Sequence, residues 1–392
     1  GGGDRAGSAR RARVVRAALG GVCGLNDGWE HVQWVADHPG AKDTNGFTRQ
    51  NWFEPVGREC RMLREAAGII DISNFAKYRV SGAQAEDWLN AVFANTMPKA
   101  VGRSCLTPLI GVRGGIAGDF TVTRLDEDEF MIIGSGMAER YHQRFWKMVP
   151  MPEGVRFESL TDSLCGFNVA GPKSRELLQR LTNTSLATGD FPFMRSKRIE
   201  LAGVQCVALR VSFTGDLGWE LHCKTEDQLR LYEALLDCAK DFDAGPVGAR
   251  ALMSLRVEKG YGSWSREYSP EYWPQEVGLA GLIKLDKDFL HKEAYLAIKD
   301  NAPREHLCIV EILSPDNADA TGGEPIFDKS GAGVGRVTSG TYGYGVNKSL
   351  ALCYLKNVTA GDAVDVMILG KPHHAVVLPE APFDPKGEKL RA

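Results

Sequence analysis

One short unit occurs twice in the chain and restricts the folds that it can adopt. The first copy, residues 80–89, reads Val-Ser-Gly-Ala-Gln-Ala-Glu-Asp-Trp-Leu, and the second, residues 169–178, reads Val-Ala-Gly-Pro-Lys-Ser-Arg-Glu-Leu-Leu. Each copy follows a β-type run, turns at a glycine and continues with apolar residues at helical spacing. A repeated strand–glycine–helix unit predicts two related α+β subdomains that face each other, and a cleft between subdomains is a favoured ligand site. The unit is also a common local arrangement, so coincidence stays open at this point.

Hydrophobic periodicity predicts the other main elements. Residues 51–70 are expected to form an amphipathic helix, and two further helices are expected over 225–240 and 247–259. After residue 304 the chain consists of short apolar runs separated by turn residues, which is typical of a small β-barrel or sandwich. The polar tail from Pro385 is expected to be frayed.

Composition excludes several classes of protein. A chain of 392 residues with a formal net charge of −3 can form two or three soluble domains and is not expected to bind nucleic acid. It has no apolar run long enough for a membrane span. The nine cysteines are scattered and form no Cys-x-x-Cys, which indicates reduced thiols in an intracellular compartment. No metal is expected, because His373-His374 lacks further ligands at suitable spacing and is interpreted as a solvated pair.

The stretch from Ser212 to Leu221 carries the strongest sign of a ligand site. It reads Ser-Phe-Thr-Gly-Asp-Leu-Gly-Trp-Glu-Leu, with a strand before it and another beginning at its end. Glycines at 215 and 218 let the backbone turn and approach a ligand closely, and Glu220 could face the same cleft. Read from the residues alone, the stretch fits an ordinary hairpin equally well.

The chain resembles the folate-binding aminomethyltransferase family, and within it the C-terminal half of the dimethylglycine and sarcosine dehydrogenases. The stretch at 212–221 resembles that family's aromatic-Thr-Gly-Glu-x-Gly-x-Glu signature. Further likeness lies in Asn-Trp-Phe-Glu-Pro-Val-Gly at 51–57 and Val-Thr-Ser-Gly-Thr-Tyr-Gly-Tyr at 337–344. The resemblance implies the three-lobed aminomethyltransferase fold, an α+β fold with two related subdomains and a C-terminal β-barrel. It also implies one-carbon transfer to tetrahydrofolate.

The resemblance assigns roles to five residues. Asp119 would be catalytic, because a buried carboxylate can stabilise a cationic one-carbon species and accept a proton from a folate amine. Glu220 would accept two N–H bonds from the pterin edge, and Arg250 would bind the carboxylates of the folate glutamate tail. Phe213 and Trp264 would contact the cofactor, although Trp264 fits a place in the core equally well. Arg256 and Glu258 also match the family, and we interpret them as structural charges.

Three positions depart from the family pattern. Many aminomethyltransferases have two adjacent aspartates where this chain has Gly118-Asp119, so only the second carboxylate is kept. Phe213 stands where many relatives have tyrosine, so a ring remains but its hydroxyl is lost, which puts full-rate chemistry in doubt. Ala251 stands where the family motif continues Arg250 with aspartate.

The beginning of the chain has two interpretations. Arginines at 5, 10, 11, 13 and 16 are compatible with a transit-peptide remnant. Gly-Trp-Glu-His at 28–31 resembles the linker between the flavin and folate halves of the dehydrogenase relatives, and we favour this second interpretation. The expected domains are a tail or linker over 1–45, a folate-binding domain over 46–303 and a barrel domain over 304–392.

The resemblance implies a function with two alternatives. The expected activity is transfer of a methylene or methyl group from an N-methylated amine, such as dimethylglycine or sarcosine, to give 5,10-methylenetetrahydrofolate. FAD would belong to a missing domain or to a separate flavin oxidoreductase partner. One alternative is a non-catalytic regulatory subunit of the pyruvate dehydrogenase phosphatase type, and the other is the folate half of a longer flavoprotein. The expected location is the cytoplasm or the mitochondrial matrix.

Overall fold

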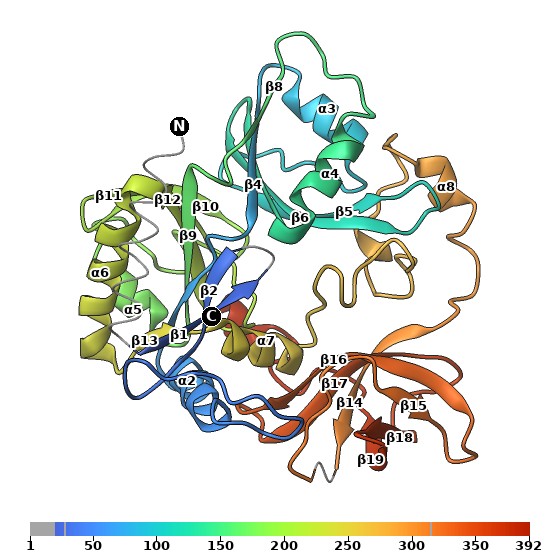
Figure 1. Ribbon diagram of the computed structural model, residues 1–392. Coiled ribbons are helices and arrows are strands. Elements are labelled where there is room, and N and C mark those ends of the chain that lie inside the picture. The colour runs from blue at the N-terminus through green and yellow to red at the C-terminus, as the bar shows by residue number, and fades with distance from the viewer. Residues whose placement is uncertain (1–19, 27–28, 314–315) are drawn as a thin grey trace.

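A computed structural model describes residues 20–26, 29–313 and 316–392 and shows three lobes (Figure 1). The arginine-rich segment within the first 19 residues lies outside the described part of the chain. Two of the lobes are mixed α/β units, and the third is a closed β-barrel. The prediction of two α+β subdomains followed by a barrel is confirmed.

The first lobe is a five-stranded sheet in the order β5-β6-β7-β4-β8. Its apolar face packs against two helices around a core that includes Trp88, Phe130 and Trp146. The elements of this lobe are β4 (Ala76–Ser81), α3 (Ala85–Val92), β5 (Ser104–Ile110), β6 (Ile116–Asp126), β7 (Glu129–Gly134), η1 (Gly136–Ala138), α4 (Glu139–Trp146) and β8 (Arg156–Ser159).

The second lobe is a six-stranded sheet in the order β10-β11-β12-β9-β3-β13. Helices α5 and α6 pack on it around Phe167, Trp219 and Tyr232. The elements are β3 (Gly68–Asp71), β9 (Leu164–Ala170), α5 (Ser174–Gln179), β10 (Ser196–Leu201), β11 (Val204–Leu209), β12 (Gly218–Lys224), η2 (Thr225–Asp227), α6 (Gln228–Ala239), η3 (Lys240–Phe242) and β13 (Gly245–Val247).

The two copies of the repeated unit occupy equivalent places in these two lobes. Gly82 follows β4 and precedes α3 with a φ of 124°, and Gly171 follows β9 and precedes α5 with a φ of 125°. A Cβ at either position would lie 2.4 Å from a backbone carbonyl oxygen, of Gly154 in one lobe and of Leu63 in the other. Glycine is required at both turns for the same steric reason, so the two copies agree in structure as well as in sequence.

The expected helix over 51–70 is shorter than the periodicity indicates. Helix α2 spans Phe53–Glu65, and the residues after it form strand β3. Strand β3 pairs with β9 on one side and with β13 on the other. The paired Ile69 and Ile70 are buried, and β-branched residues suit such a position. Pairing of β3 with β9 and β13 therefore overrides the helical pattern at the C-terminal end of the predicted helix.

The third lobe closes as a barrel in the order β14-β17-β16-β15-β18-β19. Closure excludes the sandwich alternative. Its strands are β14 (His306–Ile312), β15 (Pro325–Phe327), β16 (Gly333–Gly343), β17 (Lys348–Leu355), β18 (Ala363–Ile368) and β19 (Lys371–Val377), and η4 (Ala280–Leu282) and α8 (Lys292–Leu296) lie in the preceding connection. The interpretation of His373-His374 as a solvated pair is wrong for one member. His373 is buried while His374 is exposed, because alternate residues of β19 face opposite sides.

Helix α7 (Ala249–Glu258) lies between the second lobe and the barrel, beside α2 and strand β16. An N-terminal hairpin of β1 (Gly21–Asn26) and β2 (Trp29–Val35) contacts α2 and α7. The buried Glu59 carboxylate of α2 joins them, since it accepts the N–H of Val35 and that of Gly248, each at 2.6 Å.

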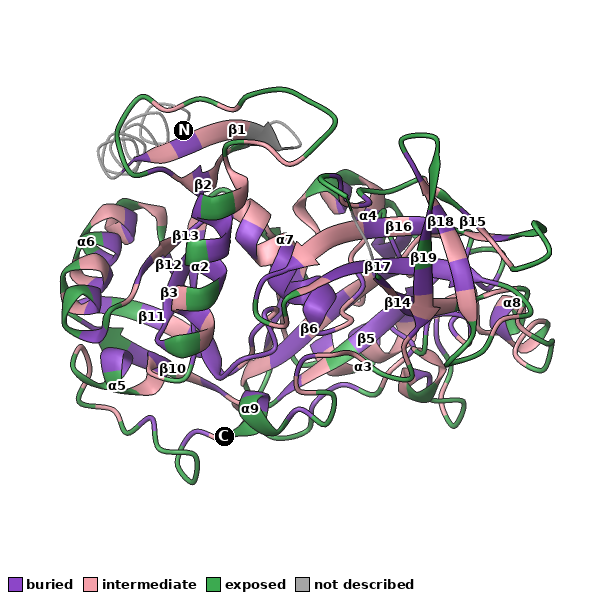
Figure 2. Ribbon diagram, turned by 90° about the horizontal axis from the view of Figure 1, so that it is seen from below, coloured by how far each residue is buried: buried purple, intermediate pink, exposed green. Residues whose placement is uncertain are grey.

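The tail after the barrel is folded, and the expectation of a frayed end is wrong. It forms the short helix α9 (Glu388–Arg391) and returns to the second lobe, where Arg210 donates to the carbonyl of Arg391 at 3.0 Å. Figure 2 shows buried residues along the strands and exposed residues on the outer side of α6 and in loops. Among the described residues, no helix combines the length and the apolar character that a membrane crossing would need.

Candidate functional site

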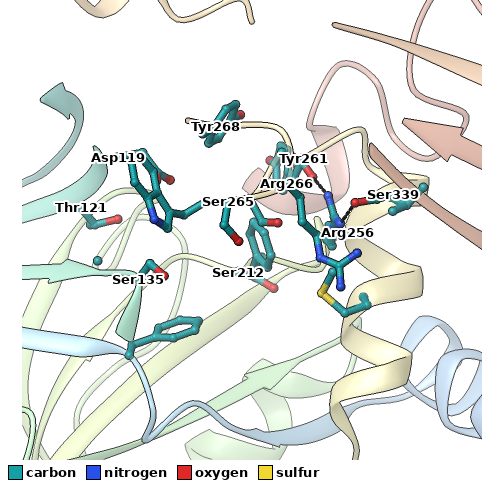
Figure 3. Close-up of a pocket in the computed structure, with 18 of the residues that line it drawn as sticks. Asp119, Thr121, Ser135, Ser212, Arg256, Tyr261, Ser265, Arg266, Tyr268 and Ser339 are labelled. Atoms are coloured by element: carbon teal, nitrogen blue, oxygen red, sulfur yellow. Dashed lines mark hydrogen bonds between the residues drawn. The ribbon is translucent and has the colours of Figure 1, made fainter. Parts of the chain in front are cut away.

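A cavity of about 860 Å³ lies between the lobes. Strands of both sheets, helix α7, strand β16 of the barrel and the loop over 261–268 contribute to its wall. Figure 3 shows Asp119 on one side of this cavity, and Arg256, Arg266 and Ser339 on the other. All five residues predicted from the sequence line it: Asp119, Phe213, Glu220, Arg250 and Trp264.

Asp119 reaches the cavity from strand β6, where it pairs in register with Pro108 of β5. The tight approach at the start of this strand requires glycine, since a Cβ at Gly115 would lie 2.3 Å from the carbonyl oxygen of Pro270. Loss of hydration raises the pKa of Asp119 to about 6. The carboxyl group can therefore exchange a proton with a bound amine near neutral pH.

The missing first carboxylate of the aspartate pair has a structural explanation. A Cβ at Gly118 would lie 2.6 Å from the Phe120 ring and 2.9 Å from Nε2 of His142. His142 is fully buried on α4, and burial lowers its pKa to about 3, so the imidazole is neutral. Two aromatic side chains thus fill the space that a second aspartate would need.

Glu220 lies on the central strand β12, between Leu209 of β11 and Asn168 of β9. Its side chain is 11% exposed, and one carboxylate oxygen lies 3.6 Å from Nε2 of His222. Burial lowers the pKa of His222, so this ring is also neutral. A nearly desolvated carboxylate at a cavity wall is a strong acceptor for N–H donors.

Sequence reasoning missed a buried lysine near Glu220. Lys77 of β4 is fully buried, and its ammonium donates to the carbonyls of Ser73 and Phe75 at 2.9 and 2.8 Å. Burial lowers the pKa of Lys77 to about 8, although the charge of Glu220 opposes that shift. Lysine is rarely buried, but no sequence pattern indicated that this one would face a carboxylate of the other lobe.

The turn before Glu220 is held by charges that do not face the cavity. Asp216 forms an ion pair with Arg64 of α2, and the same guanidinium lies 2.6 Å from Glu258 of α7. Glu258 and Arg256 both form internal ion pairs, which agrees with their interpretation as structural charges, although Arg256 also lines the cavity. Arg256 pairs with Glu267 at 2.8 Å, and both side chains are fully buried. These pairs connect α2, α7 and the loop that carries Trp264.

Aromatic rings form much of the remaining wall. The Phe213 ring is stacked against Tyr261, with centroids 6.0 Å apart and planes inclined at 22°. Trp264 lies edge-on to His142 at 5.2 Å, and it lines the cavity rather than belonging wholly to the core. Burial, with a smaller contribution from the charge of Asp119, raises the pKa of Tyr268, which also lines the cavity. Flat heteroaromatic groups fit such walls.

Arg250 lines the cavity, but its guanidinium is engaged within the protein. It forms an ion pair with Asp43 at 2.7 Å, and the charge lies 4.5 Å from the centroid of the Trp52 ring. Asp43 also accepts the indole N–H of Trp34 at 2.6 Å. No pattern in the sequence indicated that Asp43 would form an ion pair with Arg250.

Comparisons with known proteins agree with this geometry. Residues 14–287 match the GCVT N-terminal domain, and residues 306–384 match the glycine cleavage T-protein C-terminal barrel domain. The chain is 34% identical to mouse (Mus musculus) mitochondrial dimethylglycine dehydrogenase over 366 residues, which cover 91% of this chain and 42% of that protein. It is 31% identical to an aminomethyltransferase of Symbiobacterium thermophilum over 344 residues, covering 84% of this chain and 90% of that protein.

A solved structure has the same fold. The glycine cleavage system aminomethyltransferase T from Bartonella henselae superposes with a TM-score of 0.81 at 21% identity, covering 95% of this chain and 96% of that one. The chain spans less than half the length of the dimethylglycine dehydrogenase that it matches.

Proposed function

Because the chain belongs to the glycine cleavage T-protein family, the family of the aminomethyltransferases, we propose that its central cavity binds tetrahydrofolate for one-carbon transfer. The observation that carries the proposal is the gathering of Asp119, Glu220 and the aromatic residues Phe213 and Trp264 around one cavity. These residues come from both sheets and from the loop after α7, so only the folded chain brings them together.

The cavity has the size and the chemistry for this ligand. A volume of about 860 Å³ lies within the roughly 300–1,000 Å³ usual for small-molecule sites. Aromatic walls suit a flat pterin, a buried carboxylate suits its N–H edge, and arginines on the far side suit a carboxylate tail. Tetrahydrofolate supplies the nitrogens that accept the one-carbon unit.

Asp119 and Glu220 have separate roles in the proposal. Asp119, with a pKa of about 6, holds a proton or gives it up near neutral pH and stabilises positive charge beside it. Glu220 orients the ligand, because a fixed carboxylate accepts paired N–H donors in one geometry only. Phe213 packs against the ligand without a hydroxyl to offer.

The donor of the one-carbon unit is proposed to be an N-methylated amine such as dimethylglycine or sarcosine. Support comes from the name of the dimethylglycine dehydrogenase relative. The oxidation that such a donor requires is assigned to a flavin oxidoreductase, either a separate partner or another part of a longer protein. The catalytic relatives favour a transferase over a non-catalytic regulatory subunit. In this proposal residues 1–45 are a linker, 46–303 bind folate and 304–392 form the barrel domain.

Calorimetric titration of tetrahydrofolate tests the site. We expect Glu220→Gln to weaken binding about ten- to hundred-fold, the usual effect of a lost charged hydrogen bond. Glu226→Gln is the matched control, because Glu226 follows the same strand and its side chain is 74% exposed. We expect Asp119→Asn to bind tetrahydrofolate but to lose one-carbon transfer in an assay with an added amine-oxidising flavoenzyme. The absence of wild-type binding at millimolar ligand would refute the proposal.

A further inference from the structure

Among the described residues, three arginines line the cavity, and two of them are already engaged by other residues. Arg250 pairs with Asp43 and lies over Trp52. Arg256 donates to the carbonyl of Tyr261 at 2.9 Å, to Glu267 at 2.8 Å and to the Ser339 hydroxyl at 2.6 Å. An anionic ligand group would have to displace one of these internal acceptors to reach either guanidinium.

The third arginine, Arg266, is not engaged in this way. Its side chain is exposed and lines the cavity. Within the described ranges, no ion pair or side-chain hydrogen bond involves its guanidinium. The neighbouring carboxylate of Glu267 is occupied, because it accepts bonds from Arg256, Thr338 and Ser339.

The loop that carries Arg266 is held rigidly. Ser265 has a φ of 67°, a left-handed conformation that is uncommon for a residue with a side chain. Backbone bonds close the loop around it, since Ser265 donates to the carbonyl of Tyr268 at 2.8 Å and Glu267 donates to that of Ser263 at 3.1 Å. A rigid loop presents a charged side chain to a ligand at a small entropic cost.

The position of Arg266 gives the cavity two ends of opposite charge. Asp119 lies on the far side of the cavity, and the Arg266 side chain points into it from the side of Arg256 (Figure 3). We propose that Arg266, rather than Arg250, binds the carboxylates at the tail of the folate. This inference rests on the proposed function, and it identifies which side chain selects an anionic ligand.

A pair of matched ligands tests the inference. One is tetrahydrofolate, and the other is its diamide, in which both tail carboxylates are carboxamides. We expect the wild-type chain to bind tetrahydrofolate about ten- to hundred-fold more tightly than the diamide. Arg266→Gln should reduce this preference to about two-fold or less by weakening tetrahydrofolate alone, and Arg266→Lys should restore part of it. Arg140→Gln, which changes an exposed arginine of α4 that does not line the cavity, is the control.

The outcomes separate this inference from the proposed function. Wild-type binding of neither ligand would overturn both. Equal wild-type affinity for the two ligands, with Glu220→Gln weakening both alike, would support the folate site and overturn the role of Arg266. If the preference for tetrahydrofolate over the diamide persists in Arg266→Gln but disappears in Arg250→Gln, the role of Arg266 is also overturned. The tail carboxylates would then be assigned to Arg250.

Discussion

The Arg250 guanidinium lies 2.7 Å from the Asp43 carboxylate, which also accepts the indole N–H of Trp34. This contact ties the segment before α2 to the first turn of α7, 207 residues along the chain. The sequence predicts that Arg250 binds a carboxylate of the ligand. In the folded chain its guanidinium is instead paired with the carboxylate of Asp43.

The first prediction concerns this pair. Both side chains are about 30% exposed, so we expect Asp43→Asn to reduce the free energy of unfolding by only about 0.2–1 kcal/mol. Arg250→Gln also loses the contact with Trp52 and should cost about 0.5–1 kcal/mol more. Urea unfolding of both variants and the double variant measures the coupling. Fully additive losses would show that the pair contributes nothing to stability.

The second prediction concerns proton exchange at Asp119. Burial raises its pKa from 3.8 to about 6, so the rate of one-carbon transfer should rise with pH through about 6 as the carboxylate becomes free to accept a proton. Asp119→Asn should lower the rate about 10²- to 10⁴-fold and abolish this dependence. Rates measured from pH 5 to 8 on both proteins check it, and an unchanged profile in the variant would assign the titration to another group.

The same shift makes a prediction for stability. The pKa of Asp119 is raised in the folded state, so its contribution to stability is fully present below about pH 4 and is lost as pH rises through about 6. Above pH 6 we expect Asp119→Asn to be more stable than the wild-type protein, on the order of 1–3 kcal/mol, with the difference vanishing near pH 4. Denaturant unfolding at several pH values measures it. Subtracting the stability curve of the variant from that of the wild-type protein removes the contributions of other groups with a raised pKa, such as Glu59 and Asp216.

A third change tests why the aspartate pair is incomplete. We expect Gly118→Asp to destabilise the protein by about 1–3 kcal/mol, because the new side chain meets the Phe120 ring and His142. In a His142→Ala background, where the new side chain still meets the Phe120 ring but no longer meets His142, the same change should cost less. Thermal unfolding of the four proteins gives the comparison, and equal costs in both backgrounds would contradict the steric explanation.

The fifth prediction concerns Arg64, whose side chain is 7% exposed and pairs with both Asp216 and Glu258. Arg64→Met leaves two buried carboxylates without their cationic partner, so we expect a loss of about 3–5 kcal/mol. Arg61→Met is the control, because Arg61 lies on the exposed side of the same helix. Guanidinium unfolding measures both, and similar losses would show that the pairing of Arg64 is not important.

The repeated glycine turns were accessible from the sequence, because they depend on a local pattern, whereas Asp119 and Glu220 were singled out by the family resemblance. Gly82 and Gly171 mark turns that only glycine can make. Short apolar runs separated by turn residues indicate a barrel or a sandwich, and the structure decides for the closed barrel. The folate role of these residues came from a family resemblance and stays a prediction for each side chain.

Tertiary structure decided the features that depend on contacts between distant segments. Ile69 and Ile70 continue a helical pattern, yet they form a strand because β9 and β13 are available on both sides. Asp43 forms an ion pair with Arg250, and Lys77 lies near Glu220. Arg266 has no side-chain partner in the part of the chain that the structure describes. The amino-acid sequence by itself determined which chemical groups the chain carries and where its glycine turns lie. Packing decided which of these groups remain free to bind a ligand. An ion pair between residues far apart in the chain leaves no periodic pattern in the sequence, so it could not be predicted from the sequence.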